Sequence, residues 1–577
     1  MMYEFQSQTL WAACLGLLSH WTYFIHGEYH MLAPVYGSLF LVLLSILYII
    51  ELHFHKNTSV ALEAELEVIA AYLGTLFASI VAYRVLFHRL QRFPGPFGAK
   101  VSKVWHAWKV RHSQNHLVMD KLYHRYGTFV RTGPEEITIF HPDALVAMNG
   151  PGSTCTRSDW YDGLYPLQSL ANIRSPAVHD QRRRIWDKAF SAGAVRDYDS
   201  RIIKYAEQLN LLIAASVDQP VNVYAKFSFF TSDVMSDLSF GKSFGQLVED
   251  KFHHSVLGVR EFMGVFGTMS PIPWQVPPLF ITLAADQAAS VSTSCSMTLC
   301  NFEPSFRMLM ILFRFGRLGN KPMMQLNGWK SLMNFTKDSL RTRMMNEPPV
   351  PDIASYLLSA SAGRLEEDAN YLDGDALVLN IVGSDQTSTA LITLFAQLAR
   401  YPKYQEQIFQ EVQKISSVTD FLAVLRLPIL KSVIMETLRL WPPLPTGIGR
   451  VVPAGGLTIA GRHIPRGTTI FAPRYTIARL ESCFEKATEF VPERWTSRPE
   501  MVIDKRAYNP FSTGRYSCVG QRLAMRKISH VTALLISKYT VEFGPDDDGT
   551  RCFRDMQDNL TMNPGRLDLV FRLRKAD

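Results

Sequence analysis

One cysteine near the C-terminal end of the chain has the surroundings of a metal ligand. In the stretch NPFSTGRYSCVGQRLAM (residues 509–525), Cys518 lies between Gly514 and Gly520, and Phe511 precedes it by seven positions. Glycines let a backbone approach a flat group closely. A helix starting after Cys518 would favour the thiolate over the thiol through its dipole. The pattern predicts a sulfur that is presented to a ligand, although a free cysteine is more often an inert core residue.

The other cysteines narrow the chemistry that Cys518 can perform. The seven cysteines are scattered and odd in number, and they form neither a C-x-x-C pair nor a disulfide framework. Zinc would need three or four Cys or His ligands close together, and no such cluster is evident. A single thiolate as the only protein ligand points instead to haem, whose porphyrin supplies four further donors.

Two further constellations precede the cysteine. In LKSVIMETLRLWPPLP, Glu436 and Arg439 are three residues apart on a predicted helix and can therefore meet on one face. The apolar flanks indicate that this pair is buried, and a buried pair needs further hydrogen-bond partners. The segment FVPERW supplies one such partner in Arg494. Taken singly, the first motif reads equally as a surface ion pair and the second as an ordinary turn.

The composition is that of a large globular protein. The 577 residues are 47% hydrophobic and 19% charged, the net charge is +8 and the pI is about 9.0. A mildly basic chain suits an anionic membrane surface or an acidic partner protein. No dense Lys/Arg tract with interleaved aromatic residues argues for nucleic acid.

The N-terminal 91 residues predict a membrane region with one to three transmembrane helices, at about residues 9–25, 31–50 and 68–83. Residues 31–50 carry no charge and are long enough to span a bilayer core of about 30 Å. A Pro/Gly hinge is expected at residues 92–100 (RFPGPFGAK), and the catalytic domain at residues 101–577.

Charges around the third segment predict its orientation. Four basic residues follow it without an intervening acid, whereas the link before it is rich in glutamate. The positive-inside rule then places the body in the cytosol. With three spans the link faces the lumen, where the sequon at Asn57 could be glycosylated, although a chance sequon is the commoner case.

The ordered set of motifs resembles the cytochrome P-450 family of haem-thiolate monooxygenases. The family has three motifs in a fixed order. Glu436 and Arg439 match the first, E-x-x-R, and residues 492–495 match the second, P-E-R-F/W. Phe511, Gly514, Cys518 and Gly520 match the third, F-x-x-G-x-R-x-C-x-G. The resemblance runs from about Phe93 to the C-terminus. It implies one mostly α domain with small β-sheets, Cys518 as the axial ligand of haem b, and Glu436, Arg439 and Arg494 as a structural triad.

The resemblance also assigns a distal segment, NIVGSDQTST (residues 380–389). Gly383 would let a helix open over the oxygen site, and Asp385 would be the acid of a proton relay. Gln386 stands where the family usually has threonine, and Thr387 follows. This departure leaves three possibilities: water organised by Gln386 or Thr387, help from a substrate hydroxyl, or a reaction without ordinary oxygen activation. Without the resemblance the segment reads as a polar break in a helix.

The propionate contacts implied by the family are also altered. Tyr516 stands where the pattern has arginine, and it offers a neutral hydrogen bond without charge. His179, Arg183 and Arg450 are then the candidates for the haem propionates. A solvated basic helix face is the alternative for the first two.

The function that these features imply is oxidation of an apolar, membrane-accessible small molecule. The form of the signature resembles fungal secondary-metabolism members, acting on terpenoids, polyketides or alkaloids. Electrons would come from NADPH-cytochrome P-450 reductase or cytochrome b5, at the membrane of the endoplasmic reticulum. Six residues could form a basic docking face, and ordinary solvated surface charge is the equal alternative for each: Arg182, Arg184, Lys188, Arg522, Arg526 and Lys527. The substrate pocket is predicted at residues 160–173 and 262–271, with Val382 on the distal helix.

Two alternatives remain open at this point. A redox-neutral isomerase or dehydratase of the same fold would need no reductase, and Gln386 is its only support. A non-catalytic membrane haem-binding protein is the second, and the retention of Gly383 and Asp385 speaks against it.

Overall fold

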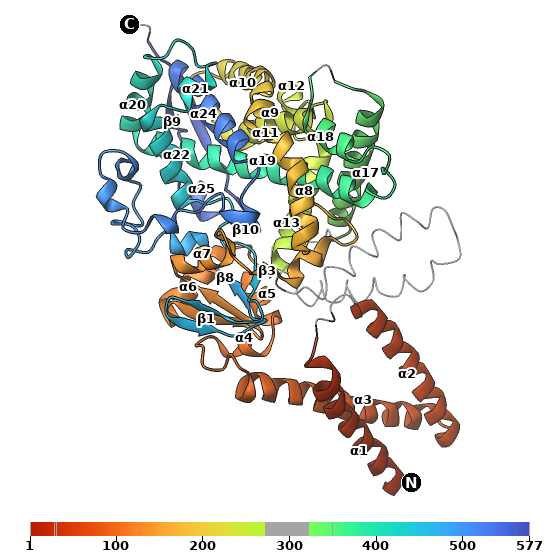
Figure 1. The fold of residues 1–577 in the computed structure, drawn as a ribbon. Helices are drawn as coiled ribbons and strands as arrows, with labels where there is room; N and C mark the ends of the chain where they lie inside the picture. Colours follow the sequence, from red (N-terminus) through yellow and green to blue (C-terminus); the bar gives the residue numbers. More distant parts are fainter. Residues whose placement is uncertain are drawn as a thin grey trace.

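A computed structural model describes residues 2–27, 29, 32–269, 271, 322–348 and 350–575. It shows a large, mostly helical body with three helices projecting from one side (Figure 1). The expected fold class, mostly α with small β-sheets behind N-terminal apolar helices, is confirmed.

The projecting helices are α1 (Met2–Ser19), α2 (Ala33–His55) and α3 (Thr58–Ala82), with short π-helical turns at His20–Phe24 and Tyr83–Phe87. α1 packs along α3, where Thr75 Oγ1 donates to the carbonyl of Ala13 over 3.0 Å and Gly16 leaves room for the contact. Two stretches are long and apolar enough to cross a membrane, Val35–His55 and Thr58–Phe87. α1, which holds much of the predicted first segment, is not among them.

The chain that leaves α3 is attached to the body. Arg84 Nη1 donates to the carbonyl of Val101 over 2.7 Å, and His88 Nε2 lies 2.6 Å from Glu135 Oε1. Leu90 and Phe93 are buried in the same apolar cluster as the small sheet. The predicted Pro/Gly hinge (residues 92–100) therefore contains residues that pack on the body, such as Phe93. It also contains most of the short helix α4 (Phe97–Val101).

Four small sheets lie around the helices. The largest has the strand order β1-β2-β8-β5-β3, formed by Phe129–Gly133, Glu136–Ile139, Thr469–Phe471, Arg450–Val451 and Thr156–Arg157. β3 and β5 are antiparallel, and Arg157 is directly opposite Arg450. The other strands are β4 (Pro220–Asn222), β12 (Asp568–Leu573) and β9 (Tyr539–Phe543), the hairpin β6 (Leu457–Ile459) and β7 (Arg462–Ile464), and the hairpin β10 (Gln557–Asn559) and β11 (Thr561–Asn563).

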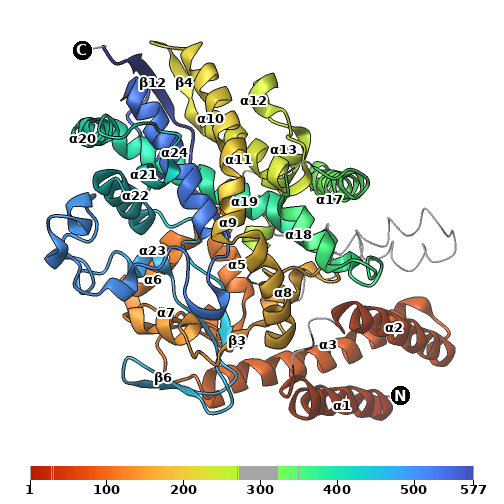
Figure 2. The ribbon, with the colours of Figure 1, turned by 45° about the horizontal axis from the view of Figure 1, so that its top comes forward.

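The longest helix of the body, α19 (Ala369–Arg400), passes through its centre (Figures 1 and 2). Apolar residues occur around most of its circumference, as expected of a helix buried on several sides. It packs on α11 (Val223–Phe240), and a Cβ at Gly383 would lie 2.4 Å from Met235 Cε, so glycine permits this approach. α19 runs unbroken past Gly383, whereas the sequence predicted an opening there.

Two other helices frame the site. α22 (Pro428–Leu440) begins with Pro428 at its first position and ends before Pro442-Pro443. α24 (Gln521–Lys538) begins just after Cys518. The remaining helices are as follows: α5 Val104–Val110, α6 Asn115–Tyr126, α7 Pro142–Asn149, η4 Asp159–Leu164, α8 Pro176–Ala189, α9 Ala192–Asp197, α10 Asp199–Ala214, α12 Gln246–Glu249, α13 His254–Met269, α17 Pro322–Met345, α18 Ile353–Ala360, α20 Pro402–Val412, α21 Phe421–Val424, α23 Arg474–Ile477, η5 Pro492–Trp495, η6 Pro499–Met501, η7 Lys505–Ala507, η8 Gly514–Tyr516 and α25 Thr550–Arg554.

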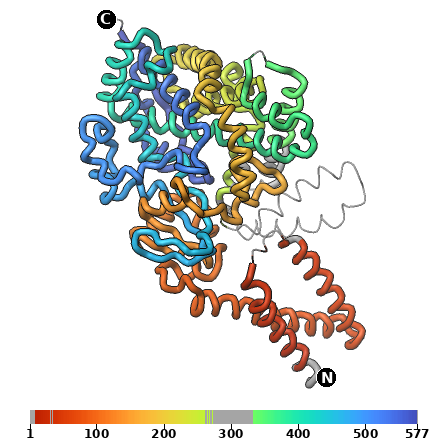
Figure 3. The backbone as a smooth tube through the Cα atoms, in the orientation of Figure 1, coloured from red at the N-terminus to blue at the C-terminus, as the bar shows by residue number. Residues whose placement is uncertain are grey.

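The two ends of the chain lie far apart along the molecule (Figure 3). The N-terminus is at the tip of the projecting helices, and the C-terminal strand β12 belongs to a sheet on the opposite side of the body. The loop that contains Cys518 and the helix α19 line one cavity within the body.

Candidate active site

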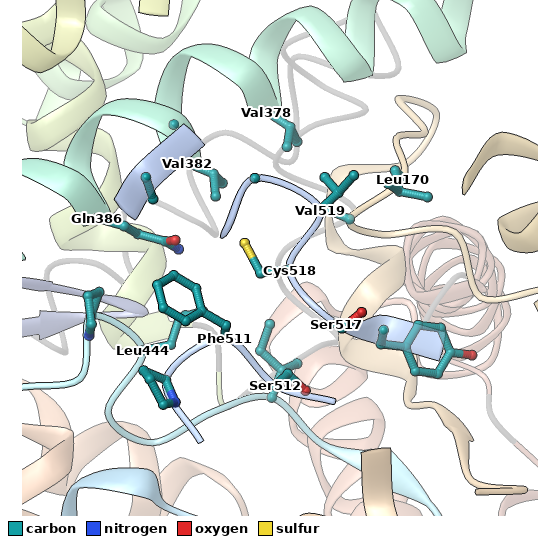
Figure 4. A pocket seen from close by; sticks show the side chains of 18 of the residues that line it. Leu170, Val378, Val382, Gln386, Leu444, Phe511, Ser512, Ser517, Cys518 and Val519 are labelled. Atoms are coloured by element: carbon teal, nitrogen blue, oxygen red, sulfur yellow. The ribbon is translucent and has the colours of Figure 1, made fainter. Parts of the chain in front are cut away.

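Cys518 lies in a tight loop that directs its sulfur into a cavity. The loop contains the 3-10 turn η8, and the Cys518 amide donates to the carbonyl of Phe511 over 2.8 Å. Gly514 has a φ of +66°, and a Cβ there would lie 2.2 Å from the carbonyl oxygen of Asn149, so glycine is required. Figure 4 shows the sulfur directed toward the side of the cavity formed by α19.

The surroundings of the sulfur act on its pKa in opposite directions. Cys518 is exposed to the cavity, but the cavity is enclosed by the body, and burial raises the pKa of the thiol. The amides of Gly520 and Gln521, at the start of α24, and the charges of Arg183 and Lys527 lower it. Cationic groups and a helix N-terminus therefore favour the thiolate, which a bound metal would hold fully deprotonated.

The opposite wall of the cavity is α19. Val378, Val382 and Gln386 all line the cavity, and the amide end of Gln386 points toward the Cys518 side (Figure 4). Thr387 lies beside it, and its Oγ1 donates to the carbonyl of Gly383 over 3.4 Å. The sequence thus places a carboxamide where a small hydroxyl was the family expectation.

Asp385 lies on the same turn of α19 and does not line the cavity. Burial raises the pKa of its carboxyl, and the charge of Arg260 on α13 opposes that rise. Arg260 is held by Ser228 Oγ, 2.7 Å from its Nη2, and by stacking on Tyr224 and Phe252. A carboxyl in this setting can hold a proton closer to neutral pH than a solvated aspartate can.

A cluster of guanidinium groups lies at the edge of the cavity. Arg157 and Arg450 are paired across β3 and β5, and each guanidinium lies 4.6 Å from the ring centre of Tyr516, which lies between them. The ring of His179 contacts Tyr516 at 4.8 Å, and burial lowers the pKa of this histidine to about 4. Arg474 also lines the cavity, and burial, together with the charge of Arg450, lowers its pKa to about 10.

No carboxylate among the described residues pairs with Arg157, Arg450 or Arg474, whose guanidinium groups donate to backbone carbonyls and to the Tyr161 hydroxyl instead. Like charges directly opposite each other on paired strands are destabilising. Moreover, the Nε atoms of Arg157 and Arg450 and the hydroxyl of Tyr516 are buried without a hydrogen-bond partner among the described residues. Buried polar groups are normally satisfied, so the cluster is suited to carboxylate groups of a ligand in the cavity. Arg157 and Arg474 were not among the sequence candidates.

Arg183 lies on a different part of the site from this cluster. Its Nε pairs with Asp187 Oδ1 at 2.7 Å, and its Nη1 donates to the carbonyl of Ser517 over 2.8 Å. It therefore buttresses the loop of Cys518, next to the sulfur rather than among the orphaned polar atoms. Arg515 is exposed and pairs with Asp180.

Glu436, Arg439 and Arg494 are brought together in the interior. Arg439 makes a bidentate pair with Glu436 at 2.8 and 2.9 Å, and Arg494 Nε donates to Glu436 Oε1 over 3.0 Å. The two guanidinium groups also donate to carbonyls of six residues: Ala478, Ala487, Glu489, Glu485, Lys486 and Met501. The network thus holds the long irregular segment that leads into the cysteine loop.

Comparison with known proteins decides the family. The family model "Cytochrome P450" matches residues 94–302 and 296–571. The chain belongs to the cytochrome P-450 family. It is 32% identical to cytochrome P450 monooxygenase notG' of Aspergillus versicolor, over 97% of this chain and 96% of that protein. It is 31% identical to tryprostatin B 6-hydroxylase of Aspergillus fumigatus, over 98% and 96%.

The solved structures agree on the fold. The haem domain of cytochrome P450DA covers 80% of this chain and 94% of its own, with a TM-score of 0.63 and 18% identity. This cytochrome P-450 is therefore a haem b monooxygenase of the fungal secondary-metabolism type that oxidises a small molecule. These expectations from the sequence are confirmed.

The described residues of this cytochrome P-450 suit haem. A sulfur faces the cavity from one side, α19 closes it from the other, and the arginine cluster with its orphaned donors matches two propionate groups. Phe511 lies beside the sulfur on the floor of the cavity (Figure 4). The cavity also receives Leu170 from the predicted pocket segment 160–173. In the second segment, 262–271, the structure describes neither Ser270 nor the side chains of Phe262, Val265, Phe266, Thr268 and Met269. None of the described residues of that segment lines the cavity.

The predicted basic docking face needs correction. Arg182, Arg526 and Lys527 are buried, with exposed fractions of 6%, 7% and 1%. Arg182 pairs with Asp375, and Arg526 pairs with Asp199 at 2.7 Å. The sequence shows these charges but does not show the carboxylates with which Arg182 and Arg526 pair. Arg184, Lys188 and Arg522 remain exposed.

Proposed function

We propose that Cys518 is the axial ligand of the haem iron and that Arg157, Arg450, His179 and Tyr516 hold the haem propionates. The observation that carries the proposal is the sulfur facing α19 across a cavity whose edge holds two guanidinium groups, each with an unsatisfied Nε atom. Arg183 supports the loop of the ligand. Glu436, Arg439 and Arg494 fix the segment before it.

Haem bound in this cavity supplies the activation of oxygen. The chain's own part is to position substrate, exclude water and deliver protons. Gln386 projects its amide into the cavity, where it can orient a water molecule by donating and accepting hydrogen bonds. Asp385 holds a proton at its carboxyl oxygens, and Thr387 can pass a proton through its hydroxyl once it releases the Gly383 carbonyl. Apolar residues keep bulk water out: Leu170, Val378, Val382 and Leu444.

The electron donor that we propose is NADPH-cytochrome P-450 reductase, with cytochrome b5 as an alternative. A hollow lined by Arg183, Gln521, Arg522 and Met525 lies over the Cys518 side of the body. Arg184, Lys188 and Arg522 offer exposed positive charge to an acidic partner near it. The apolar helices α2 and α3 support anchoring in the endoplasmic reticulum membrane with the body in the cytosol, because basic residues follow α3.

The proposed substrate is an apolar secondary metabolite that can take one hydrogen bond from Gln386. A relative of this chain is named for its 6-hydroxylation of tryprostatin B, so tryprostatin B is the first compound to test. Three substrate classes stay open from the sequence: terpenoid, polyketide and alkaloid. Product analysis with reductase and NADPH would show which of them the enzyme oxidises. Turnover without reductase would instead support redox-neutral chemistry.

The carbon monoxide difference spectrum of the reduced protein tests the ligand. Wild type should give the red-shifted Soret band of a thiolate complex. Cys518→Ala should lose that band and all turnover. Cys483→Ala is the matched control, because Cys483 is buried in the sheet cluster and does not line the cavity. An unshifted, imidazole-type spectrum in wild type, or turnover by Cys518→Ala, would overturn the assignment.

A further inference from the structure

Lys527 is a buried cation that the site described above does not explain. It lies on α24, its side chain lines the same cavity as Cys518, and its exposed fraction is 1%. Its Nζ donates to the carbonyl of Gly383 on α19 over 3.0 Å. One side chain thus ties the helix that begins at the cysteine to the helix that forms the opposite wall.

Within the described part of the chain, no carboxylate lies within ion-pair distance of this ammonium. The other buried cation of α24, Arg526, differs because Asp199 pairs with it. An ammonium removed from water is costly unless an anion or several acceptors compensate it. A single backbone carbonyl is only partial compensation.

The cavity that Lys527 lines holds no carboxylate among its described residues, since no Asp or Glu lines it, whereas Lys527 and Cys518 both do. Burial lowers the pKa of Lys527 to about 7, and the charge of Cys518 raises it. Lys527 therefore carries its charge on the wall of the cavity that receives the sulfur.

The other end of the contact bears on the distal wall. The Gly383 carbonyl accepts hydrogen bonds from Lys527 and, at 3.4 Å, from Thr387 Oγ1. Gln386 and Asp385 follow Gly383 within one turn of α19. A fixed Gly383 carbonyl consequently fixes the backbone from which the Gln386 amide projects into the cavity.

We propose that Lys527 is a positioning residue that holds the Gln386 turn of α19 through the Gly383 carbonyl and places an unpaired positive charge on the wall of the cavity that receives the Cys518 sulfur. The inference rests on the proposed role of Cys518 as haem ligand. The charge and the hydrogen bond are separable functions of one side chain. Removing the charge should act on the iron, whereas removing the donor should act on the distal wall.

Three variants of the full-length holoenzyme separate the two functions. Lys527→Met keeps the length of the side chain but has neither charge nor donor, Lys527→Gln keeps a donor, and Lys527→Arg keeps both. Lys538→Met is the matched control, since Lys538 is exposed at the far end of α24 and pairs with Glu207. The readouts are the haem reduction potential and the hydrogen peroxide released per NADPH consumed.

A positive charge near the iron favours the reduced state. We expect a more negative potential for Lys527→Met and Lys527→Gln, and no shift for Lys527→Arg or Lys538→Met. We expect increased peroxide release for Lys527→Met and less of an increase for Lys527→Gln, because the amide can still bind the Gly383 carbonyl. Equal potentials in all variants would overturn the proposal.

Loss of haem is itself informative. If Lys527→Met and Lys527→Gln retain less haem while Lys527→Arg retains a wild-type amount, the charge is what matters, as proposed. If Lys527→Arg lost as much haem as Lys527→Met and Lys527→Gln, the shape of the lysine side chain rather than its charge would be needed. That result would overturn the proposal. A failure of the proposed haem-ligand role of Cys518 can be told apart from a failure of this inference. In the first case the wild-type protein itself would lack the thiolate spectrum.

Discussion

Arg157 shows at the scale of one residue how this chain manages the tyrosine in its cysteine signature. Tyr516 brings no charge, but its ring lies between two guanidinium groups that come from β3 and β5. Arg157 is further held by the carbonyls of Leu170 and Ile173, at 3.1 and 2.6 Å. The positive charge is thus supplied from the sheet rather than from the cysteine loop.

Replacing Arg157 should weaken haem binding. Arg157→Leu removes a charged hydrogen-bond donor, which contributes about 1.5–3 kcal/mol, so haem should dissociate roughly tenfold faster or more. The measurement is transfer of haem to excess apomyoglobin, followed by absorbance. Arg462→Leu in β7 is the control, because that guanidinium stacks on Phe93 away from the cavity. Equal haem loss from both variants would contradict the role of Arg157.

The sequence identified the residues with local signatures and missed those defined by distant partners. Cys518, Phe511 and Gly514 belong to one short motif and could be predicted together. Arg157 lies in a strand of two residues, and its significance depends on Arg450, which is far along the chain. Arg182 and Arg526 read as surface charges because Asp375 and Asp199, which bury them, come from other helices.

At the scale of elements, Glu436 on α22 organises the segment that precedes the cysteine loop. Its carboxylate accepts hydrogen bonds from Arg439, Arg494, the amide of Val491 and Trp495 Nε1. Because the carboxylate and both guanidinium groups are almost completely buried, none has water as an alternative partner.

Glu436→Ala should destabilise the protein strongly. It leaves two buried guanidinium groups without their anion, at a cost of about 3–5 kcal/mol. The measurement is urea unfolding followed by circular dichroism, with haem content measured in parallel. Glu500→Ala, in the nearby turn η6, is the control: Glu500 is exposed, pairs among the described residues only with the exposed Arg498 over 3.4 Å and should cost far less. Similar unfolding midpoints for the two variants would contradict the organising role.

The β10–β11 hairpin is held by a carboxyl that titrates. Asp558 accepts a hydrogen bond from Thr446 Oγ1 at 3.2 Å, and its Oδ2 lies 4.0 Å from His116 Nδ1. Burial raises the pKa of Asp558 to about 7 from an ordinary value of 3.8. Burial also lowers the pKa of His116 to about 3, so this histidine is neutral at neutral pH and does not compensate the carboxylate.

Stability should therefore fall as Asp558 ionises. Between pH 3.8 and about 7 the native state keeps a proton that the unfolded chain releases. The stabilisation is complete below this window and is lost as the pH rises through it. Asp558→Asn should become more stable relative to wild type between pH 5 and 8, as measured by urea midpoints. Asp546→Asn is the control, because this carboxyl is exposed, and its urea midpoint should change with pH as that of wild type does. If the urea midpoint of Asp558→Asn also followed that of wild type across this pH range, the argument would be refuted.

At the scale of the whole molecule, the fold class followed from the ordered motifs, but the way the apolar N-terminal helices are attached to the body did not. Composition marks where an apolar run ends and cannot show what its polar continuation touches. The sequence placed residues 84–91 in the membrane region before the hinge, yet Leu90 is fully buried and His88 is 1% exposed. Contacts of His88 to Glu135 and of Arg84 to Val101, formed only in the folded body, attach this segment to it.

Two truncations should differ accordingly. Deleting residues 1–81 removes α1, α2 and nearly all of α3 but keeps Arg84, His88 and Leu90. This form should retain haem and the unfolding midpoint of the full chain. Deleting residues 1–91 also removes Leu90 from the core, which costs about 1.5–3 kcal/mol, and leaves the carbonyl of Val101 and the Arg131 guanidinium without Arg84.

The comparison is made by urea unfolding of both forms after release from the membrane fraction. The shorter deletion should still bind lipid vesicles weakly, because Leu86 and Phe87 are exposed at its new N-terminal end, with exposed fractions of 58% and 70%. The longer deletion lacks Leu86 and Phe87 and should not bind lipid vesicles through them. Full-length His88→Gln serves as a matched variant that alters the Glu135 contact without shortening the chain. If both deletions unfolded at the same urea concentration, residues 82–91 would be a simple linker, and the body would begin at the hinge that the sequence predicted.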